Sequence, residues 1–313
     1  MQLAHCDVLI VAPMTDLHAR AVIDPIKRHG GTVALASFRH LAETDALSIH
    51  GEKIYSSSLR IGDSLIDLRQ TRSIWWRRVE NPIGRPNGTS ESWFRYKEWQ
   101  SFLFSLEAAS DCHWVNRPSR QWFACRKALQ MAVANRLGLR TPATLITNDA
   151  AQVREFRKRF AMTIFKSMGE AAHENTATRT LSDHDMDRLD SLVNCPAIFQ
   201  EFIEARFDIR LTVIGNRMFA VRIDSQNGQS HVDWRFDNSV DFELFEMEPG
   251  IKARISLLMR ELGLTYGAID LRQTTDGEYV FLEVNPSGQY LFAELLTGAK
   301  ISEALAEELL RLA

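Results

Sequence analysis

The chain has 313 residues, of which 45% are hydrophobic and 25% are charged, and its formal net charge is -3. This near-neutral balance gives no electrostatic footprint for nucleic acid or for an acidic membrane surface. No apolar run reaches the roughly 18–20 residues of a membrane-spanning helix. No basic flank precedes the apolar run at the N-terminus, so we expect no signal peptide. Length and composition predict a soluble globular protein of two or three packed units.

The cysteines are few and widely scattered, at Cys6, Cys112, Cys125 and Cys195. The sequence has no CxxC pair and no Cys/His spacing typical of a zinc site. We therefore expect reduced thiols and a cytoplasmic location.

Strand and helix signals alternate in the first third of the chain, which favours an open α/β sheet. A helix is predicted at about 16–29, ended by Gly30-Gly31, and an aromatic-rich helix is predicted at 91–110. The segment IYSSSLRIGDSLIDL alternates like a β-hairpin, with Gly62-Asp63 as its turn. Short apolar runs predict the other strands, in CDVLIVA, TVALASF, SIWWRRV and WVNRPS.

The remaining two thirds contain longer helical patterns and more strands. Helices are predicted at 119–138, from Asp149, up to about 193, at 250–262 and near 300–312. Loops are expected at 167–180 and 227–250. Strands are predicted in LRTPATLITND, MTIFKS, AIFQEFI, DIRLTVIG and RMFAVRIDS, and in the pair TYGAIDLRQ and EYVFLEVNP.

The sequence lacks the commonest nucleotide and nucleophile motifs. There is no GxxxxGK[ST] and no GxGxxG, which argues against a Walker or Rossmann phosphate site, and there is no GxSxG nucleophile elbow. Instead, separated lysines, carboxylates and amides follow one another along the chain, at Lys127, Lys166, Gln200, Glu201, Asp208, Asp270, Glu283 and Asn285.

The strand in VFLEVNPSG carries a glutamate and an asparagine two positions apart. Alternate side chains of a strand share a face. We therefore expect Glu283 and Asn285 to point the same way, and Phe281 and Val284 to point elsewhere.

Asp270 lies on the preceding predicted strand, across a tight turn, so it can face Glu283 across the ladder. Mg²⁺ takes about six oxygen ligands, usually one or two carboxylates together with nucleotide phosphates. Asp270, Glu283 and Asn285 are therefore predicted to form a magnesium site. The alternative is a solvated acidic face of a strand.

In this order the residues resemble the ATP-grasp superfamily, and within it the microviridin-type, or graspetide, ligases that crosslink ribosomal peptides. Lys127, Lys166, the QEFIEARFD segment and the array from Asp270 to Asn285 carry the superfamily resemblance. The subfamily resemblance rests on segments that span nearly the whole chain, IWWRRVENP, GLRTPATLITND, DIRLTVIGNRMFAVRIDSQ, HVDWRFD, TYGAIDLR and FLEVNPSGQYLF.

The fold implied by this resemblance is α/β, an ATP-grasp fold preceded by an open α/β domain. It implies an N-terminal pre-ATP-grasp domain at 1–118, a central ATP-grasp subdomain at 119–195 and a C-terminal subdomain with the metal site at 196–313. The cofactors implied are ATP and Mg²⁺, with Glu283 bridging two ions that hold the β- and γ-phosphates.

Other candidate residues would bind the nucleotide. Lys127 and Lys166 can neutralise phosphate charge as ammonium groups. Lys166 interrupts an apolar strand pattern, whereas Lys127 taken alone is typical of a surface charge. Gln200-Glu201-Phe202 would be the hinge that reads adenine largely through backbone groups, and Asp208 is suited to accept hydrogen bonds from both ribose hydroxyls. The alternative for Glu201 and Asp208 is ordinary exposure at the ends of strands.

Three arginines, Arg210, Arg222 and Arg235, lie between the ribose and metal segments. Planar guanidinium groups suit the dispersed negative charge of an acyl phosphate. We expect these arginines to hold the acid and its phosphate, although each could equally be a structural ion-pair partner. Arg77 and Arg78 follow two tryptophans, and at most one should point into a cleft.

The reaction implied by the resemblance is ligation through an acyl phosphate, with ADP as a product. The partner would be a precursor peptide with a leader segment, whose Asp or Glu is joined to a Ser, Thr or Lys. We expect residues 167–180 to form a lid over the triphosphate and the protein to be a homodimer. Three alternatives remain: a ligase that adds free amino acids to a protein or peptide, a small dipeptide ligase, and an ATP-binding regulatory protein without turnover.

Overall fold

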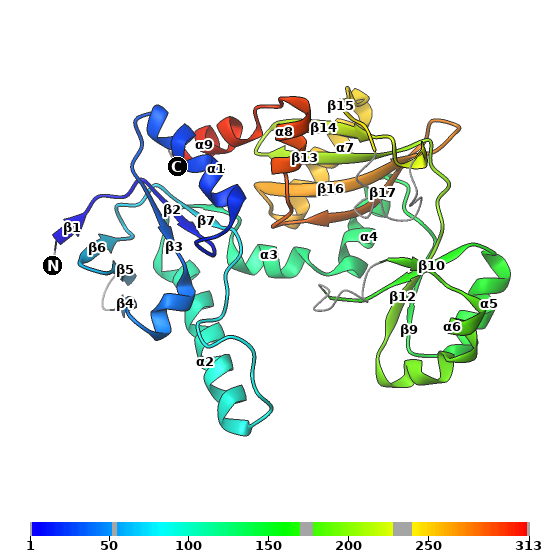
Figure 1. Ribbon diagram of the computed structural model, residues 1–313, viewed down its shortest axis with the longest axis horizontal. Helices are drawn as coiled ribbons and strands as arrows, with labels where there is room; N and C mark the ends of the chain where they lie inside the picture. The colour runs from blue at the N-terminus through cyan, green and yellow to red at the C-terminus, as the bar shows by residue number, and fades with distance from the viewer. Residues whose placement is uncertain (1, 52–54, 170–177, 228–239, 312–313) are drawn as a thin grey trace.

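The computed structural model describes residues 2–51, 55–169, 178–227 and 240–311 (Figure 1). Within these ranges the strands form three four-stranded sheets and one five-stranded sheet. No helix in the described ranges is both long and apolar enough to cross a membrane.

A parallel sheet with the strand order β3-β2-β7-β8 organises the N-terminal part. Because parallel strands end at one common edge, the residues that follow β2, β7 and β8 meet there. Helix α1 (Leu17–Arg28) follows β2 and begins where the Asp16 side chain accepts a hydrogen bond from the Ala19 amide. The strands are β2 (Val8–Val11), β3 (Val33–Ala36), β7 (Ser73–Trp76) and β8 (His113–Val115).

A second, mixed sheet packs beside the first, in the order β1-β6-β5-β4. The predicted hairpin is confirmed, because β5 and β6 pair antiparallel from Ile61 and Ser64 outward, with Gly62 at a φ of 55°. The strands are β1 (Gln2–Ala4), β4 (Ala46–Gly51), β5 (Tyr55–Ile61) and β6 (Ser64–Asp67). Helix α2 (Ser90–Ser105) precedes β8 and confirms the aromatic-rich helix.

The predicted helix at 119–138 is two helices, α3 (Pro118–Ala124) and α4 (Lys127–Arg136). The break lies at Cys125 and Arg126, where the Arg126 backbone is extended. Because the chain changes direction there, α3 brings Gln121 to Ser287 while α4 starts at the residue that bonds Glu283. Single-helix periodicity therefore missed a break that both contacts need.

The central sheet has the order β11-β10-β12-β9 and pairs antiparallel throughout. Helix α5 (Ala150–Arg159) begins at Asp149 as expected, and α6 (Asp183–Asp187) is followed by a 3₁₀ turn at Leu189–Asn194. Strand β12 belongs to this sheet, although our boundary at 195 placed it in the C-terminal subdomain. The strands are β9 (Thr144–Thr147), β10 (Thr163–Lys166), β11 (Arg179–Thr180) and β12 (Ala197–Glu201).

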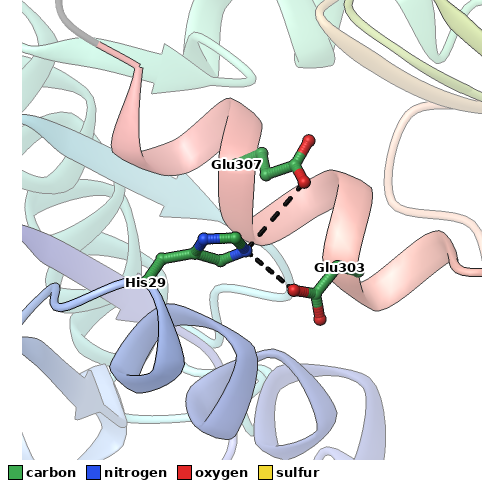
Figure 2. Close-up of side chains that lie close together, drawn as sticks. All are labelled: His29, Glu303 and Glu307. Atoms are coloured by element: carbon green, nitrogen blue, oxygen red, sulfur yellow. Dashed lines mark hydrogen bonds and ion pairs between the residues drawn. The ribbon is translucent and has the colours of Figure 1, made fainter.

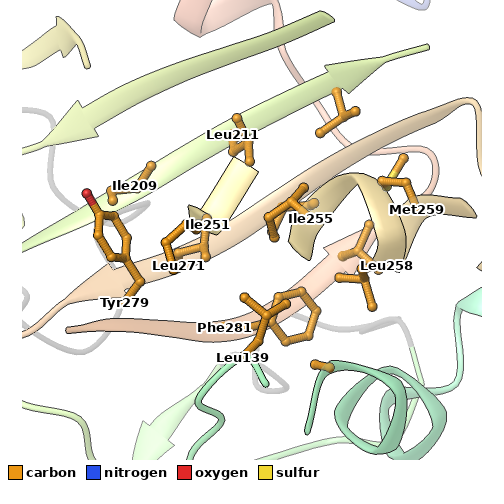
Figure 3. Close-up of a cluster of buried hydrophobic side chains, with 14 of the residues drawn as sticks. Leu139, Ile209, Leu211, Ile251, Ile255, Leu258, Met259, Leu271, Tyr279 and Phe281 are labelled. Carbon is orange, nitrogen blue, oxygen red and sulfur yellow. The ribbon is translucent and has the colours of Figure 1, made fainter. Parts of the chain in front are cut away.

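The C-terminal sheet has the order β15-β14-β13-β16-β17. Helix α7 (Pro249–Leu262) covers one face, where Ile209, Leu271 and Phe281 are buried in an apolar cluster (Figure 3). Burial of this cluster is the main stabilising term for the subdomain. The strands are β13 (Phe207–Ile214), β14 (Arg217–Ile223), β15 (Phe242–Leu244), β16 (Tyr266–Gln273) and β17 (Tyr279–Asn285).

The C-terminal helices α8 (Leu291–Thr297) and α9 (Ile301–Leu310) return to the N-terminal part of the chain. Helix α9 lies along α1, and the His29 Nε2 atom is 2.7 Å from Glu303 Oε1 and 3.9 Å from Glu307 Oε1 (Figure 2). Exposed ion pairs of this kind contribute little stability, so the apolar contacts of α9 carry the association. The first and last parts of the chain are thus held together beside the C-terminal sheet.

Candidate active site

A pocket lies between the central sheet and the face of the C-terminal sheet opposite α7. Lys166 and Gln200 reach it from the central sheet, and Asp208, Asp270 and Glu283 reach it from the C-terminal sheet. The structure therefore gathers cations, carboxylates and an amide that are far apart in the sequence. Glu201 and Ile203 also line this pocket, beside the end of β12.

The facing of Asp270 and Glu283 is confirmed by the sheet register, in which they are direct partners across β16 and β17. The register shifts immediately afterwards, because Leu271 pairs with Phe281 and leaves Leu282 as an extra residue. This β-bulge re-aims the strand. Both Leu282 and Glu283 line the pocket, while Phe281 is fully buried on the other face.

Two lysines converge on Glu283. The Lys127 ammonium from the start of α4 bonds Glu283 Oε2, and the Lys166 Nζ atom lies 3.8 Å from the same oxygen. The side chains are only 12–22% exposed, so solvent screens these charges less than it would on an open surface. Lys127 therefore pairs with a residue of the pocket and is not an isolated surface charge. The two ammonium groups provide positive charge beside Glu283, where this carboxylate and phosphate oxygens could bind the same metal ion.

Asp270 is held by Arg210, whose Nη1 atom is 2.8 Å from Asp270 Oδ1. The Nη2 atom of Arg210 donates to the Gln289 carbonyl at 2.7 Å. Asn285 Oδ1 accepts a hydrogen bond from the Ser287 amide at 2.9 Å, which fixes the side-chain rotamer. A carbonyl oxygen keeps a second lone pair in this arrangement, so Asn285 can still bind a cation.

Asp208 is nearly buried, at 4% exposure, and takes part in an ion pair. The Arg272 Nε atom lies 2.8 Å from Asp208 Oδ1, and the Ser225 hydroxyl donates to Oδ2. Burial raises the pKa of Asp208, and the Arg272 guanidinium opposes that shift. Both carboxylate oxygens therefore already have protein partners, and the ribose role stays a prediction.

Arg272 is a pocket residue that the sequence analysis did not single out. It also donates to the Ile203 carbonyl at 2.8 Å and lies over the Phe202 ring, 5.2 Å from its centroid. The sequence did contain a signal, because Arg272 lies two positions after Asp270 on the same strand and therefore shares a face with it. Arg272 thereby joins the predicted hinge to the predicted ribose carboxylate.

The predicted adenine hinge lies at the pocket edge, but most of its amides are already bonded. The Glu201 amide donates to the Ala143 carbonyl and the Phe202 amide donates to the Met162 carbonyl. Among the described residues, the Ile203 amide has no protein acceptor. If adenine binds here, backbone recognition thus falls to Ile203 and to carbonyl groups. The hinge assignment stays a prediction.

Arg222 does not join this cluster. It pairs with Ile209 in the register, whereas Arg210 pairs with Val221, so the two arginines point to opposite faces of the sheet. Arg222 lies over Phe207 and forms ion pairs with Asp224 and Glu243. Arg235 and most of the predicted lid at 167–180 lie outside the described residues.

Comparison with known proteins identifies the fold and the type of ligase. No protein-family model and no curated protein sequence matches the chain. Among solved structures, macrocyclase MdnC of Microcystis aeruginosa MRC, bound with the precursor peptide MdnA, has a TM-score of 0.86 and 28% identity over 96% of this chain and 98% of its own. Macrocyclase MdnB of the same organism has a TM-score of 0.80 and 25% identity, with coverage of 96% and 98%.

The chain has the ATP-grasp fold and is similar over nearly its whole length to the macrocyclases MdnC and MdnB. A ligase associated with ribosomal peptide modification in Chryseobacterium gregarium, at 24% identity and a TM-score of 0.84, supports the fold over 99% of this chain and 96% of its own. The family resemblance and the ATP-grasp fold predicted from the sequence are therefore confirmed. The functional roles of the individual site residues remain predictions for this ATP-grasp ligase.

Proposed function

We propose that this ligase crosslinks side chains of a ribosomally made precursor peptide, forming ω-ester or ω-amide macrocycles with consumption of ATP. The main supporting observation is that Lys166, Asp270 and Glu283 line one pocket between two sheets, and that Lys127 pairs with Glu283. The similar macrocyclase MdnC is bound with a precursor peptide in its solved structure. Whether the bond is an ester or an amide depends on the peptide nucleophile.

ATP and Mg²⁺ fit the residues of the pocket, and the sequence predicts two metal ions. PsnB, a ligase with this fold and 22% identity, has been solved with Mg and ADP and with AMPPNP. Here Asp270, Glu283 and Asn285 would hold the metal through oxygen atoms, as hard cations require. Bound Mg²⁺ supplies charge neutralisation for the β- and γ-phosphates.

The reaction needs two displacements. A carboxylate of the peptide attacks the γ-phosphorus of ATP, which releases ADP and forms an acyl phosphate. A hydroxyl or amine of the same peptide then attacks the acyl carbon, and inorganic phosphate leaves. This chain would contribute charge and positioning: Lys127 and Lys166, which lie beside Glu283, would neutralise phosphate charge, and Arg210 fixes Asp270.

A ligase for free amino acids is the main alternative. A RimK domain ATP-grasp protein from Sphaerobacter thermophilus has the same fold, but its TM-score is 0.60 and its identity is 16%. The much higher TM-score of MdnC over nearly the whole chain favours a peptide substrate. The charged residues gathered at the pocket disfavour a regulatory protein without turnover.

Dimerisation and cytoplasmic location are further proposals that follow from the family resemblance. Both suit a maturase that meets its precursor inside the cell. Sedimentation velocity of the purified ligase tests the dimer directly, since a single monomeric species at micromolar concentration contradicts it.

Removing the leader segment from the precursor should lower the crosslinking rate about 100-fold or more, because tethering raises the local concentration of the core peptide. Adding the leader back as a separate peptide should restore only part of the rate. The measurement is ADP release, with crosslinked product followed by mass spectrometry. Equal rates for full-length and leaderless precursors would contradict a split recognition of the peptide.

Arg210→Ala should lower turnover about 10–100-fold, the usual loss when a group that orients a metal ligand is removed. Arg222→Ala is a matched control on the opposite face of the same sheet and should change turnover less than about threefold. Steady-state ADP formation with precursor measures both. A larger loss of turnover for Arg222→Ala than for Arg210→Ala would show that Arg222 acts in catalysis. It would contradict the conclusion that only the sheet face with Arg210 takes part.

A further inference from the structure

The loop between β17 and α8 is held by its carbonyl groups. Asn116 Nδ2 donates to the Pro286 carbonyl at 3.0 Å, and Arg77 Nη1 donates to the Ser287 and Gly288 carbonyls. Tyr266 donates its hydroxyl to Gly288, and Arg210 Nη2 donates to Gln289, both at 2.7 Å. Four consecutive carbonyls of residues 286–289 therefore accept hydrogen bonds from side chains outside the loop.

Two of these donors come from the N-terminal sheet. Arg77 directly follows β7 and Asn116 directly follows β8, at the edge where the parallel strands end. Residues at the end of the N-terminal sheet therefore hydrogen-bond the loop that follows β17, the strand with the proposed metal ligands Glu283 and Asn285. Asn116 also fixes β16, because its Oδ1 atom accepts from the Thr265 and Tyr266 amides at 2.8 Å.

The loop in turn orients two proposed metal ligands. The Ser287 amide donates to Asn285 Oδ1 at 2.9 Å. The Gln289 carbonyl holds Arg210, whose other terminal nitrogen bonds Asp270. A displacement of the loop would therefore move the oxygen atoms of Asn285 and Asp270 together.

The loop also lies too close to β16 to shift freely. A Cβ atom at Gly288 would be 2.3 Å from the Ala268 Cβ atom and 3.0 Å from Arg210 Nη2. Contacts this short exclude a side chain at the position. Glycine at 288 is therefore needed so that the loop backbone can approach β16.

Burying the charged side chain of Arg77 at this position is energetically unfavourable. Its side chain is 0% exposed, and Asp16 Oδ2 lies 3.6 Å from its Nε atom. Burial lowers the pKa of Arg77. A buried guanidinium contributes poorly to stability compared with an apolar side chain of similar size. Its hydrogen bonds to the loop are the feature that an apolar residue could not supply.

We infer that Arg77 is a positioning residue for the metal site, acting from the N-terminal domain through the Ser287 and Gly288 carbonyls on Asn285 and Asp270. This inference rests on the proposed function, because it assumes that those residues bind Mg²⁺. Arg77 is not among the residues that line the pocket. Its effect is to keep the ligand oxygens of Asn285 and Asp270 at the spacing the metal requires.

The test uses the full chain and the nucleotide AMP-PNP, with its binding measured by calorimetry across a Mg²⁺ titration. Arg77→Lys should raise the Mg²⁺ concentration for half-maximal binding about tenfold. Tyr266→Phe, which removes a milder contact to Gly288, should shift it in the same direction but less. Arg78→Lys, at the exposed neighbour, is the matched control and should leave it unchanged.

Thermal unfolding of each variant separates positioning from loss of fold. A folded Arg77→Lys protein with the Mg²⁺ dependence of the unmodified chain would overturn the inference. So would a folded Tyr266→Phe protein whose Mg²⁺ dependence does not move, which keeps the test decisive even if Arg77→Lys fails to fold.

A double variant tests the route of the effect. If Arg77 acts through Asn285, then Arg77→Lys should cause a smaller fold-change in an Asn285→Ala background than in the unmodified chain. Fold-changes that multiply fully would mean that the two residues act independently and would overturn the proposed route.

Glu283→Gln distinguishes this inference from the proposed function. If Glu283→Gln leaves Mg²⁺-dependent binding intact, the metal site itself is wrong and the inference falls with it. If Glu283→Gln loses that binding while Arg77→Lys and Tyr266→Phe keep it, only the role of Arg77 is wrong.

Discussion

Glu283→Gln should lower ligation and ADP formation by at least about 10²–10³-fold without unfolding the protein, the loss typical of removing one preorganised charge contact at a reacting phosphate. Glu283 is the direct partner of Asp270 across the ladder and the point where Lys127 and Lys166 converge. The amide keeps the shape of the side chain but removes the charge that binds a hard cation. Asn285→Ala should act in the same direction through loss of a neutral oxygen ligand.

The control for this prediction is Glu278→Gln in the same hairpin. Glu278 is exposed and pairs with Arg140, outside the pocket. Its replacement should leave turnover within about twofold, since exposed ion pairs contribute little. ADP release at ordinary Mg²⁺ concentration, with circular dichroism to verify folding, measures both variants. Normal turnover by Glu283→Gln and Asn285→Ala would exclude the metal role.

Lys166→Ala should weaken ATP binding about 10–150-fold, while Lys127→Ala should disturb the fold little. Loss of a hydrogen bond to a charged group costs about 1.5–3 kcal/mol, which corresponds to that range in Kd. Lys166 is 12% exposed, ends β10 and lines the pocket facing Glu283. Its stem is already ordered, so the ammonium group can meet a phosphate with little further entropy loss.

Lys158→Ala is the matched control for Lys166, because it removes an exposed lysine from the same subdomain. Lys158 lies on α5 and pairs with Glu155 at 2.6 Å. Calorimetry with ATP and Mg²⁺ should give an unchanged Kd for this variant. An equally unchanged Kd for Lys166→Ala would refute the assignment of Lys166 to the phosphates.

Much of the pocket could be predicted because its residues interrupt strongly apolar strands. Lys166 breaks the pattern of β10, and Asp270 and Glu283 break those of β16 and β17. Alternation then fixed which residues share a face, and the register confirmed that Asp270 meets Glu283. Such polar positions can be recognised from the sequence because each one interrupts the apolar pattern of a single strand.

The β-bulge at Leu282 could not be predicted in the same way. Strict alternation places Phe281 on the face of Glu283, so our expectation that Phe281 points elsewhere did not follow from alternation, yet Phe281 is fully buried on the opposite face. The extra residue removes this conflict. Its position depends on the fit of β17 against β16 and α4, where Gln130 bonds both backbone groups of Val284.

Contacts between distant segments were also missed. Arg77, which directly follows β7, is buried against residues 287 and 288, while its neighbour Arg78 is exposed. The sequence pattern allowed a solvated pair or a single inward side chain. Only the packing of the N-terminal sheet against the loop after β17 decides between them.

Mass spectrometry of a candidate precursor incubated with the ligase, ATP and Mg²⁺ tests the central claim most directly. Each side-chain crosslink should remove one water from the peptide mass, with release of one ADP per bond, and tandem fragmentation should place the bond between an acidic residue and a Ser, Thr or Lys. If the peptide mass instead increases by added glutamate, or if free glutamate alone drives stoichiometric ADP release and enters the product, the protein is an amino-acid ligase and the account is contradicted.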